Sequence, residues 1–398
     1  MSLPRRVFRA VAGSAAALLL SAPGTVAASG AATPPGVAAE PVSPLVALAA
    51  MDAAIDAAIL AGRVPGGVLW LGRSDVDHVR AHGLRAVEPA AESTTTDTVY
   101  DAASLTKVVV TATAVLQQVE RGQLALDAPV ARWLPDFAAH GKGAITVRHL
   151  LAHRSGLRPG LSLQPAWSGR AAALALACAE RPQATPDERF VYSDINFIVL
   201  GELVRAVSGE ELDRYAARHI FAPLGMVDSG FNPGEALRPR IAPTERVGEA
   251  LLRGIVHDPT ARAMGGVAGH AGLFTTAADL ARFCRMILAD GRGPDGRAVL
   301  SSASVADMTR AQTNGVDRRG LGWDIDTRFS APRGTLFPTG RSFGHTGFTG
   351  TSVWIDPGSA TFVIFLSSRL HPKGQGDVSD LRRTLGTLAA EAVGLKAP

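Results

Sequence analysis

The chain has 398 residues, of which 46% are hydrophobic and 19% charged, and it contains 42 glycines and 25 prolines. This composition is typical of a globular protein with many loops, long enough to bury a substantial core in one large or two smaller domains. The formal net charge of +4 is spread without a basic run. No zinc-finger spacing or aromatic–basic module accompanies it, so nucleic-acid binding is not indicated.

The first residues have the features of an export signal. Arg5 and Arg6 precede a short apolar run that ends near Leu20 and is followed by small residues. This pattern is typical of a secretory signal that is too short to span a membrane. The paired arginines resemble a twin-arginine signal, and an ordinary secretory signal is the alternative. We expect an export signal over 1–30, an Ala/Pro-rich tether over 31–44, and a periplasmic or secreted protein.

Apolar periodicity and turn residues place strands near both ends of the remaining chain and helices between them. Strands are predicted at 66–71, 78–82 (after a turn at Ser74-Asp75), 341–345, 351–356 and 361–367. Helices are predicted at 45–61, 104–121, 147–152, 169–179, 196–208, 211–222, 276–289, 303–310 and 378–393. The economical architecture is an α+β domain over 45–395. In it, an antiparallel sheet from the N- and C-terminal segments is flanked by helices, beside an inserted, mainly helical subdomain.

The segment Ser104-Leu105-Thr106-Lys107 sets a serine and a lysine three residues apart, where extended chain at 98–101 enters an apolar helix. Residues at this spacing share a helical face, about 5–6 Å apart at Cβ, so the amine can reach the hydroxyl. A serine at its ordinary pKa is a poor nucleophile, and a neighbouring amine activates it. The pattern alone is weak, because chance matches are common, so its weight depends on partners further along.

Three further groups stand at predicted element boundaries. Tyr192 precedes a helix, and its hydroxyl can act as a general base or pass a proton to a leaving group. Asp194 stands near the start of that helix, where it either belongs to a site or only caps the helix by accepting N–H bonds. His345 ends a strand in a glycine-rich turn. It can bind a substrate carboxylate or assist proton transfer, and a tight turn that merely carries a histidine is the alternative.

In this order, Ser104-x-x-Lys107, Tyr192-Ser193-Asp194 and His345-Thr346-Gly347 resemble the motifs of the serine β-lactamase and DD-peptidase superfamily. The resemblance is strongest to the branch with class C β-lactamases, DD-carboxypeptidases and related esterases, and it covers roughly 45–393. It implies the β-lactamase/transpeptidase-like fold and an acyl-enzyme on Ser104. It also implies that Lys107 takes or holds the serine proton, and that Tyr192 passes a proton to the leaving group and later helps activate water.

The same resemblance implies the substrate-facing groups. The backbone N–H groups of Ser104 and Phe348 form the oxyanion hole, His345 and Thr346 line the substrate edge, and Asp194 completes the substrate-binding set. Two positions depart from the lactamase branch, which usually has Lys at His345 and Asn at Asp194. An ionised Asp cannot donate a hydrogen bond as an amide does. Both departures disfavour efficient β-lactam hydrolysis.

The stretch from Gly254 to Phe274 resembles a narrower group of cell-wall hydrolases. That group includes low-activity penicillin-binding carboxypeptidases and exo-acting amidases that cut between N-acetylmuramic acid and L-alanine. His257, Asp258 and His270 in this stretch raise the question of a metal, but no His-Glu-x-x-His pairing supports one. We therefore predict neither a metal nor a cofactor, and the role of these three residues stays open.

Cys178 and Cys284 both lie in apolar helical runs. Buried free thiols are the expected state, although an oxidising compartment leaves a disulfide open.

The sequence therefore predicts an exported serine hydrolase that acts through an acyl-enzyme on peptidoglycan-derived amide bonds, as a DD-carboxypeptidase or a muramyl-peptide amidase. The alternatives are, in order, a carboxylesterase, a β-lactamase, and a penicillin- or muropeptide-binding sensor that acylates slowly. The expected partner is a peptidoglycan fragment or a small ester or amide, with no membrane span in the mature chain. The oligomeric state is left open.

Overall fold

The computed structural model describes residues 43–73 and 77–396. The predicted export signal, the tether up to residue 42 and the Ser74-Asp75 turn lie outside the described residues. In the part of the chain that is described, no helix is both long and apolar enough to cross a membrane.

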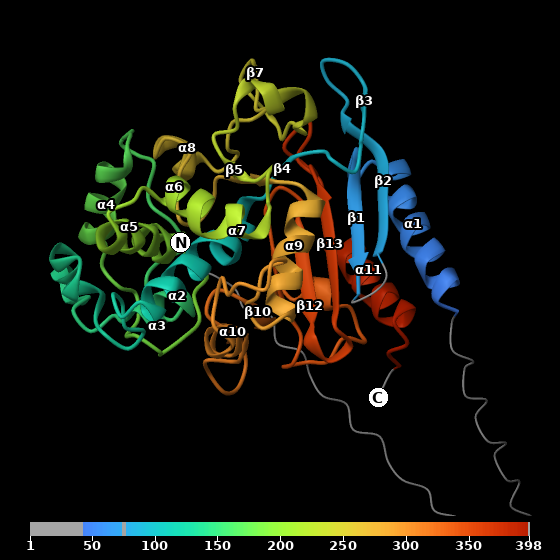
Figure 1. Ribbon diagram of the computed structural model, residues 1–398. Coiled ribbons are helices and arrows are strands. Elements are labelled where there is room, and N and C mark those ends of the chain that lie inside the picture. The colour runs from blue at the N-terminus through green and yellow to red at the C-terminus, as the bar shows by residue number, and fades with distance from the viewer. Residues whose placement is uncertain (1–42, 74–76, 397–398) are drawn as a thin grey trace, which may run out of the picture. The chain divides into compact units, whose positions relative to one another are not determined.

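The centre of the molecule is an eight-stranded antiparallel sheet with the strand order β3-β2-β1-β13-β12-β11-β10-β9 (Figure 1). Its strands are β1 (Gly66–Gly72), β2 (Asp77–Ala86), β3 (Glu92–Ser93), β9 (Arg318–Arg319), β10 (Asp324–Asp326), β11 (Phe343–Thr346), β12 (Ser352–Asp356) and β13 (Thr361–Ser367). Strands from the two ends of the chain pair directly, since β1 is hydrogen-bonded to both β2 and β13. The prediction of one antiparallel sheet built from the N- and C-terminal segments is confirmed.

Two smaller sheets lie beside the large one. One has the order β4-β8-β5 and the other pairs β6 with β7. Their strands are β4 (Tyr100–Asp101), β5 (Gly230–Phe231), β6 (Arg246–Val247), β7 (Ala250–Leu251) and β8 (Leu273–Thr275). Apart from β4, the sequence did not predict these strands, because two or three residues are too few to show an alternating pattern.

Helices flank the sheet, and most of them lie in the part of the chain between its N- and C-terminal strands. They are α1 (Pro44–Leu60), α2 (Thr113–Glu120), α3 (Val147–Leu151), α4 (Arg170–Ala179), α5 (Asp194–Ser208), α6 (Leu212–Ala216), α7 (Ala222–Leu224), α8 (Pro259–Ala263), α9 (Ala277–Leu288), α10 (Ser302–Thr309) and α11 (Ser379–Ala392). Each predicted helix has a counterpart here, and the sequence missed only the short α8. The α+β fold with flanking helices is thereby confirmed.

The helix expected over 104–121 is not regular. It begins as a 3₁₀ turn at Ala103–Leu105, widens to a π-helix at Lys107–Ala112 and becomes α2 only at Thr113. The Thr113 hydroxyl donates to the carbonyl of Val108 at 3.0 Å, five residues earlier. This bond accompanies the wider turn, and such π segments are frequent at functional sites.

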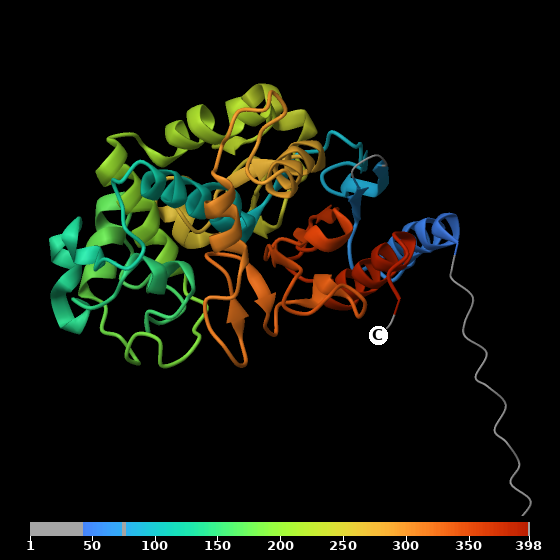
Figure 2. The same ribbon diagram turned by 60° about the horizontal axis from the view of Figure 1, so that its bottom comes forward.

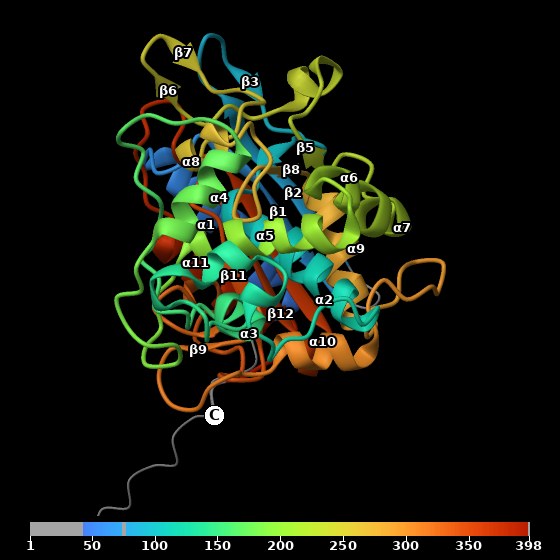
Figure 3. The same cartoon turned by 90° about the vertical axis from the view of Figure 1, so that its left-hand side faces the viewer.

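The central strands are buried on both faces, because their side chains alternate between two apolar cores. On β13, Phe362, Ile364 and Leu366 belong to the larger core, whereas Val363 and Phe365 belong to the smaller one. The smaller core lies under α1 and α11, which pack side by side (Figure 2). The larger core lies under α9 and extends into the helical block, which Figure 3 shows in front of the sheet.

The smaller core yields a stability prediction. Phe365→Ala leaves a cavity between the sheet and the α1–α11 pair, because Phe365 is 1% exposed. We expect the free energy of unfolding to fall by about 3–5 kcal/mol in guanidinium denaturation. Val227, which is 84% exposed, supplies the control, and Val227→Ala should change stability by less than about 0.5 kcal/mol. Equal effects of the two substitutions would contradict this account of the core.

Candidate active site

The segment that carries Ser104 is a strained turn directly after β4. Ala103 has φ of +48°, a conformation that residues with a Cβ rarely adopt. The buried Asp101 carboxylate holds this turn: one oxygen accepts the Ala103 N–H at 2.8 Å and the other accepts the His257 N–H at 2.7 Å. Asp101 thus ties the serine turn to the segment before α8, which explains why a non-glycine residue tolerates the strain.

Lys107 is completely buried beneath the serine. Its Nζ donates to Ser104 Oγ at 3.0 Å and to the His270 carbonyl at 2.9 Å, and it forms an ion pair with Asp194 Oδ1 at 2.7 Å. Burial by itself lowers the pKa of Lys107, but the Asp194 carboxylate and the Tyr192 oxygen outweigh it, so the pKa lies above its ordinary value. Lys107 is therefore an ammonium at neutral pH.

The Tyr192 ring packs against other rings. Its centroid lies 4.4 Å from that of His153 and 5.4 Å from that of Phe329, and the Lys107 ammonium lies 5.0 Å from its centre. Burial, followed by the charge of Arg319, keeps the pKa of His153 well below its ordinary value. The neutral ring accepts the Ser193 N–H at 3.0 Å, and this bond fixes the chain next to Tyr192.

The end of β11 approaches the serine turn closely. A Cβ on Gly347 would lie 2.0 Å from Thr351 Oγ1 and 2.6 Å from the Ala102 carbonyl, so only glycine fits there. The Thr349 hydroxyl donates to the Asp101 carbonyl at 2.7 Å. Within the described residues, the Phe348 N–H has no hydrogen-bond acceptor. It is therefore free for an oxygen atom placed between β11 and the serine turn.

His345 is a neutral imidazole at the end of β11. Burial, and then the charges of Arg319 and Lys107, hold the pKa of His345 well below its ordinary value. Its Nδ1 lies 2.9 Å from the Thr346 carbonyl, and its buried Nε2 has no partner among the described residues. His345 can therefore donate or accept a hydrogen bond, but it brings no positive charge.

A pocket of about 420 Å³ brings the predicted residues together. Its lining includes Ser104, Tyr192, His345, Thr346 and Phe348, and Lys107 lies beneath the serine.

Asp194 does not line this pocket but faces Lys107. It is the first residue of α5, whose N-cap is Ser193. The interpretation of Asp194 as only a helix cap is therefore wrong. Its carboxylate is committed to the lysine instead.

The sequence analysis missed a group of cationic side chains around the same pocket. Arg319, Arg369 and Arg382 line it together with the carboxylates of Asp324 and Asp377. Burial, followed by repulsion from Arg369, lowers the pKa of Arg382 to about 9. These arginines come from β9, from the segment after β13 and from α11. No local pattern relates these segments to Ser104, so they could not be predicted as parts of the site.

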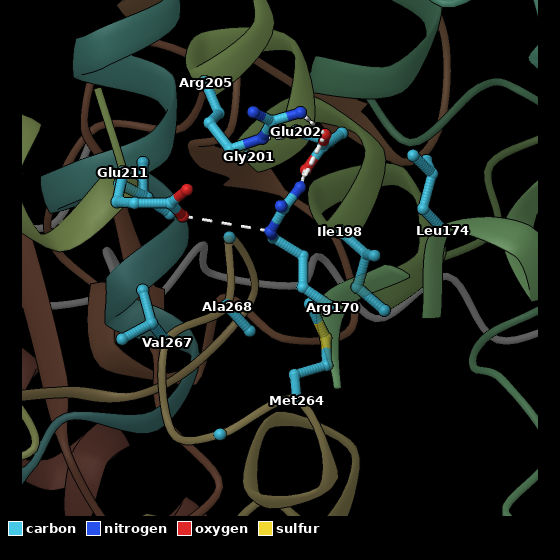
Figure 4. A pocket seen from close by; sticks show the side chains of 13 residues that line it. Arg170, Leu174, Ile198, Gly201, Glu202, Arg205, Glu211, Met264, Val267 and Ala268 are labelled. Atoms are coloured by element: carbon cyan, nitrogen blue, oxygen red, sulfur yellow. Dashed lines mark hydrogen bonds and ion pairs between the residues drawn. The ribbon is translucent and has the colours of Figure 1, made fainter. Parts of the chain in front are cut away.

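A second pocket, of about 190 Å³, lies against Gly269, on the loop that carries His270. Figure 4 shows the Arg170 guanidinium between Glu202 and Glu211. Glu202 is buried and also binds Arg205 at 2.5 Å. The charged groups that line this pocket are paired with one another, and these ion pairs hold α4 against α5. We assign the candidate site to the pocket at Ser104.

Asp194, Asp258 and His270 offer atoms within 4.8 Å of one another, a spacing that could suit a metal ion. Asp258 Oδ1 already accepts from His270 Nε2 at 2.9 Å and from the Ala261 N–H at 2.7 Å. The Lys107 ammonium occupies the position beside Asp194 that a cation would take, and the two positive charges would repel each other. The prediction of a metal-free site stays a prediction.

Cys178 and Cys284 are both free thiols. Cys284 is buried as expected, and burial raises the pKa of its thiol. Cys178 is only half-buried, because α4 lies nearer the surface than its apolar sequence indicated.

The family model described as Beta-lactamase matches residues 49–387. The chain therefore belongs to the beta-lactamase family and is a serine hydrolase of that family.

Individual relatives agree with this membership. A protein of Escherichia coli (strain K12), named "Putative D-alanyl-D-alanine carboxypeptidase", is 33% identical over 312 residues, covering 70% of each chain. A penicillin-binding protein homolog from Caulobacter crescentus has a TM-score of 0.71 at 22% identity, covering 87% of this chain and 97% of its own. EstCE1, described as a hydrolase with promiscuous acyltransferase activity, has a TM-score of 0.70 at 22% identity, covering 86% and 98%. These two structures are similar to the chain in fold.

The strained turn yields a second prediction. Asp101→Ala leaves the buried N–H groups of Ala103 and His257 without acceptors, so we expect a stability loss of at least about 2 kcal/mol. Hydrolysis of a chromogenic ester should fall by about tenfold or more, because the serine turn is no longer held. Asp97 forms an exposed ion pair with Arg240, and Asp97→Ala should cost less than about 1 kcal/mol. Matching losses in both variants would show that Asp101 has no special role.

Proposed function

We propose that this protein is an exported serine hydrolase that forms an acyl-enzyme on Ser104 and removes the terminal residue from D-alanyl-D-alanine peptides of peptidoglycan. The observation that carries the proposal is the 3.0 Å contact between Ser104 Oγ and the buried Lys107 Nζ, next to an arginine-lined pocket. The name of the Escherichia coli relative supports the substrate class. Export rests on the basic and apolar pattern at the N-terminus and places the enzyme where peptidoglycan lies.

In the proposed reaction, Ser104 Oγ attacks the carbonyl carbon of the scissile amide. The oxygen of the tetrahedral intermediate lies between the N–H groups of Ser104 and Phe348, which donate to it and stabilise its charge. Tyr192 passes a proton to the departing amine and later helps a water molecule to attack the ester. The His153 and Phe329 rings pack against the Tyr192 ring and restrict its movement in both steps.

The charges of the pocket favour a substrate that ends in a free carboxylate. Three guanidinium groups face the pocket against two carboxylates, and a planar guanidinium binds a carboxylate well. Arg369 lies beside Phe348: its Nε donates to the Phe348 carbonyl at 2.7 Å, its Nη1 donates to the Gly376 carbonyl, and its guanidinium lies over the exposed Phe348 ring. A carboxypeptidase substrate carries such a carboxylate one residue beyond the scissile bond, whereas an ester need not.

Efficient β-lactam turnover is disfavoured by the same groups. Where the lactamase branch has a lysine, this chain has a neutral His345, and the asparagine position is an Asp194 committed to Lys107. A β-lactam can still acylate Ser104, but the group that would donate a hydrogen bond from an amide is absent at Asp194. Slow acylation with slower release is the expected behaviour.

The deciding experiment is mass spectrometry of the products formed from a muramyl-pentapeptide. We expect loss of one terminal residue, with Ser104→Ala inactive and Lys107→Ala nearly so, because the two groups act as a unit. A freed peptide and a bare muramic acid would instead identify an amidase. An untouched substrate, with ester hydrolysis retained, would move the function to a carboxylesterase. No reaction with either substrate would indicate a sensor, and wild-type turnover by Ser104→Ala would overturn the site.

The carboxylate subsite has its own test. In Arg369→Gln, kcat/KM for a peptide with a free terminal carboxylate should fall by about tenfold or more, because a charge-assisted bond is lost. The value for the same peptide with a C-terminal amide should change by less than about threefold. Arg297 is exposed and pairs only with Asp295 at 3.6 Å, so Arg297→Gln is the matched control. An equal loss on both peptides would remove Arg369 from carboxylate recognition.

A further inference from the structure

The state of Lys107 raises a chemical problem for the attack by Ser104. Its Nζ donates hydrogen bonds to Ser104 Oγ and to the His270 carbonyl, and it forms an ion pair with Asp194 Oδ1. An ammonium has three donors and no lone pair, so it cannot take the serine proton as it stands. Some other group must first accept a proton from Lys107.

The titratable and charged groups that surround Lys107 come from separate parts of the chain. They are Tyr192 before α5, Asp194 on α5, Asp258 before α8, His270 before β8, His345 on β11, and the more distant His153 and Arg319. Arg319 has no lone pair to offer, and a tyrosine hydroxyl is a much weaker base than a carboxylate. His345 and His153 do not contact Nζ. Asp258 Oδ1 already accepts from His270 and Ala261.

Asp194 differs from all of these groups. Its Oδ1 lies 2.7 Å from Lys107 Nζ, is shielded from solvent, and makes no hydrogen bond to any other described group. The N-cap of α5 is Ser193 and not Asp194, so this oxygen is not used to cap the helix. The carboxylate is therefore dedicated to the lysine that contacts the nucleophile.

We propose that Asp194 is the proton acceptor that makes Lys107 a base, so that Asp194 and Lys107 work as one unit. A proton moves from Nζ to Asp194 Oδ1, and the amine lone pair takes the proton of Ser104 Oγ–H. The oxygen forms its bond to the carbonyl carbon, whose π pair moves to the carbonyl oxygen. When the intermediate collapses, the C–N bond breaks, Lys107 gives the serine proton through the Tyr192 hydroxyl to the departing amine, and the proton on Asp194 returns to Nζ. This inference rests on the proposed acylation of Ser104.

The unit has a consequence for pH dependence. In the intact protein the required proton stays inside the pair, so acylation needs no loss of a proton to solvent near neutral pH. Asp194 can act in this way only as a carboxylate, because a protonated carboxyl cannot accept a second proton. Without that carboxylate, Lys107 must lose its proton to water first. Acylation then rises with pH as Lys107 titrates, at a pKa that burial lowers and Asp194 no longer raises.

The test is the pH profile of ester acylation in Asp194→Asn, with p-nitrophenyl acetate as the probe. We expect kcat/KM at neutral pH to fall by about 10²-fold or more. We also expect the acidic limb to move upward by about two pH units or more, because it then reports the loss of a proton from Lys107. Asp194→Glu keeps a carboxylate and should retain the wild-type shape. An unchanged limb in Asp194→Asn would show that Asp194 only positions Lys107.

A second variant covers the case in which Asp194→Asn does not fold. Asp194→Ala leaves room for a small carboxylate in place of the missing side chain. Added formate should therefore raise the acylation rate of this variant by about tenfold or more at neutral pH. Ser104→Ala with formate is the control and should stay inactive. No rescue by formate would overturn the proton-acceptor role. Activity in Ser104→Ala would instead overturn the proposed function, so the two failures are distinguishable.

Discussion

The buried ammonium of Lys107 sets the main constraint on this structure, because an isolated charge in an apolar interior costs several kcal/mol unless it is paired. Its three oxygen partners come from the serine turn, the start of α5 and the loop before β8. Each of these segments must fold for the charge to be compensated. The lysine therefore couples the helical block to the small β4–β8 sheet, and its burial is tolerated only in the fully assembled molecule.

A second constraint joins the large sheet to the serine turn. Thr349 and Thr351 donate to the carbonyls of Asp101 and Ala102, and Gly347 permits the close approach. These contacts join residues about 250 positions apart in the chain. Since contacts between distant segments form late relative to local ones, we infer that the geometry around Ser104 is complete only after β11 has paired with β12 beside the N-terminal strands.

Local chemistry explains what the sequence could predict. The spacing of Ser104 and Lys107 brings them together within one turn, and alternation in β13 reveals a strand buried on both faces. Arg369 and Arg382 could not be predicted as site residues, because only the packing of α11 near the end of β13 brings them beside Gly347 and Phe348. The π-helix was also missed, since it accompanies one hydroxyl contact from Thr113 rather than a periodic pattern.

The charges of this site are placed differently from those expected for the lactamase branch, which usually has lysine at position 345 and asparagine at position 194. A lysine at His345 would put its positive charge on β11 directly beside Lys107, but the imidazole here is neutral. The positive charge of the pocket lies instead on Arg319, Arg369 and Arg382. An added charge next to Lys107 would favour its neutral form without help from a carboxylate. Without that charge, Lys107 stays an ammonium and needs a proton acceptor. An aspartate at position 194, where the lactamase branch has asparagine, supplies this acceptor. The neutral His345 and the charged Asp194 therefore belong to one electrostatic arrangement. In it, the arginines bind the substrate carboxylate and Asp194 accepts the proton of Lys107.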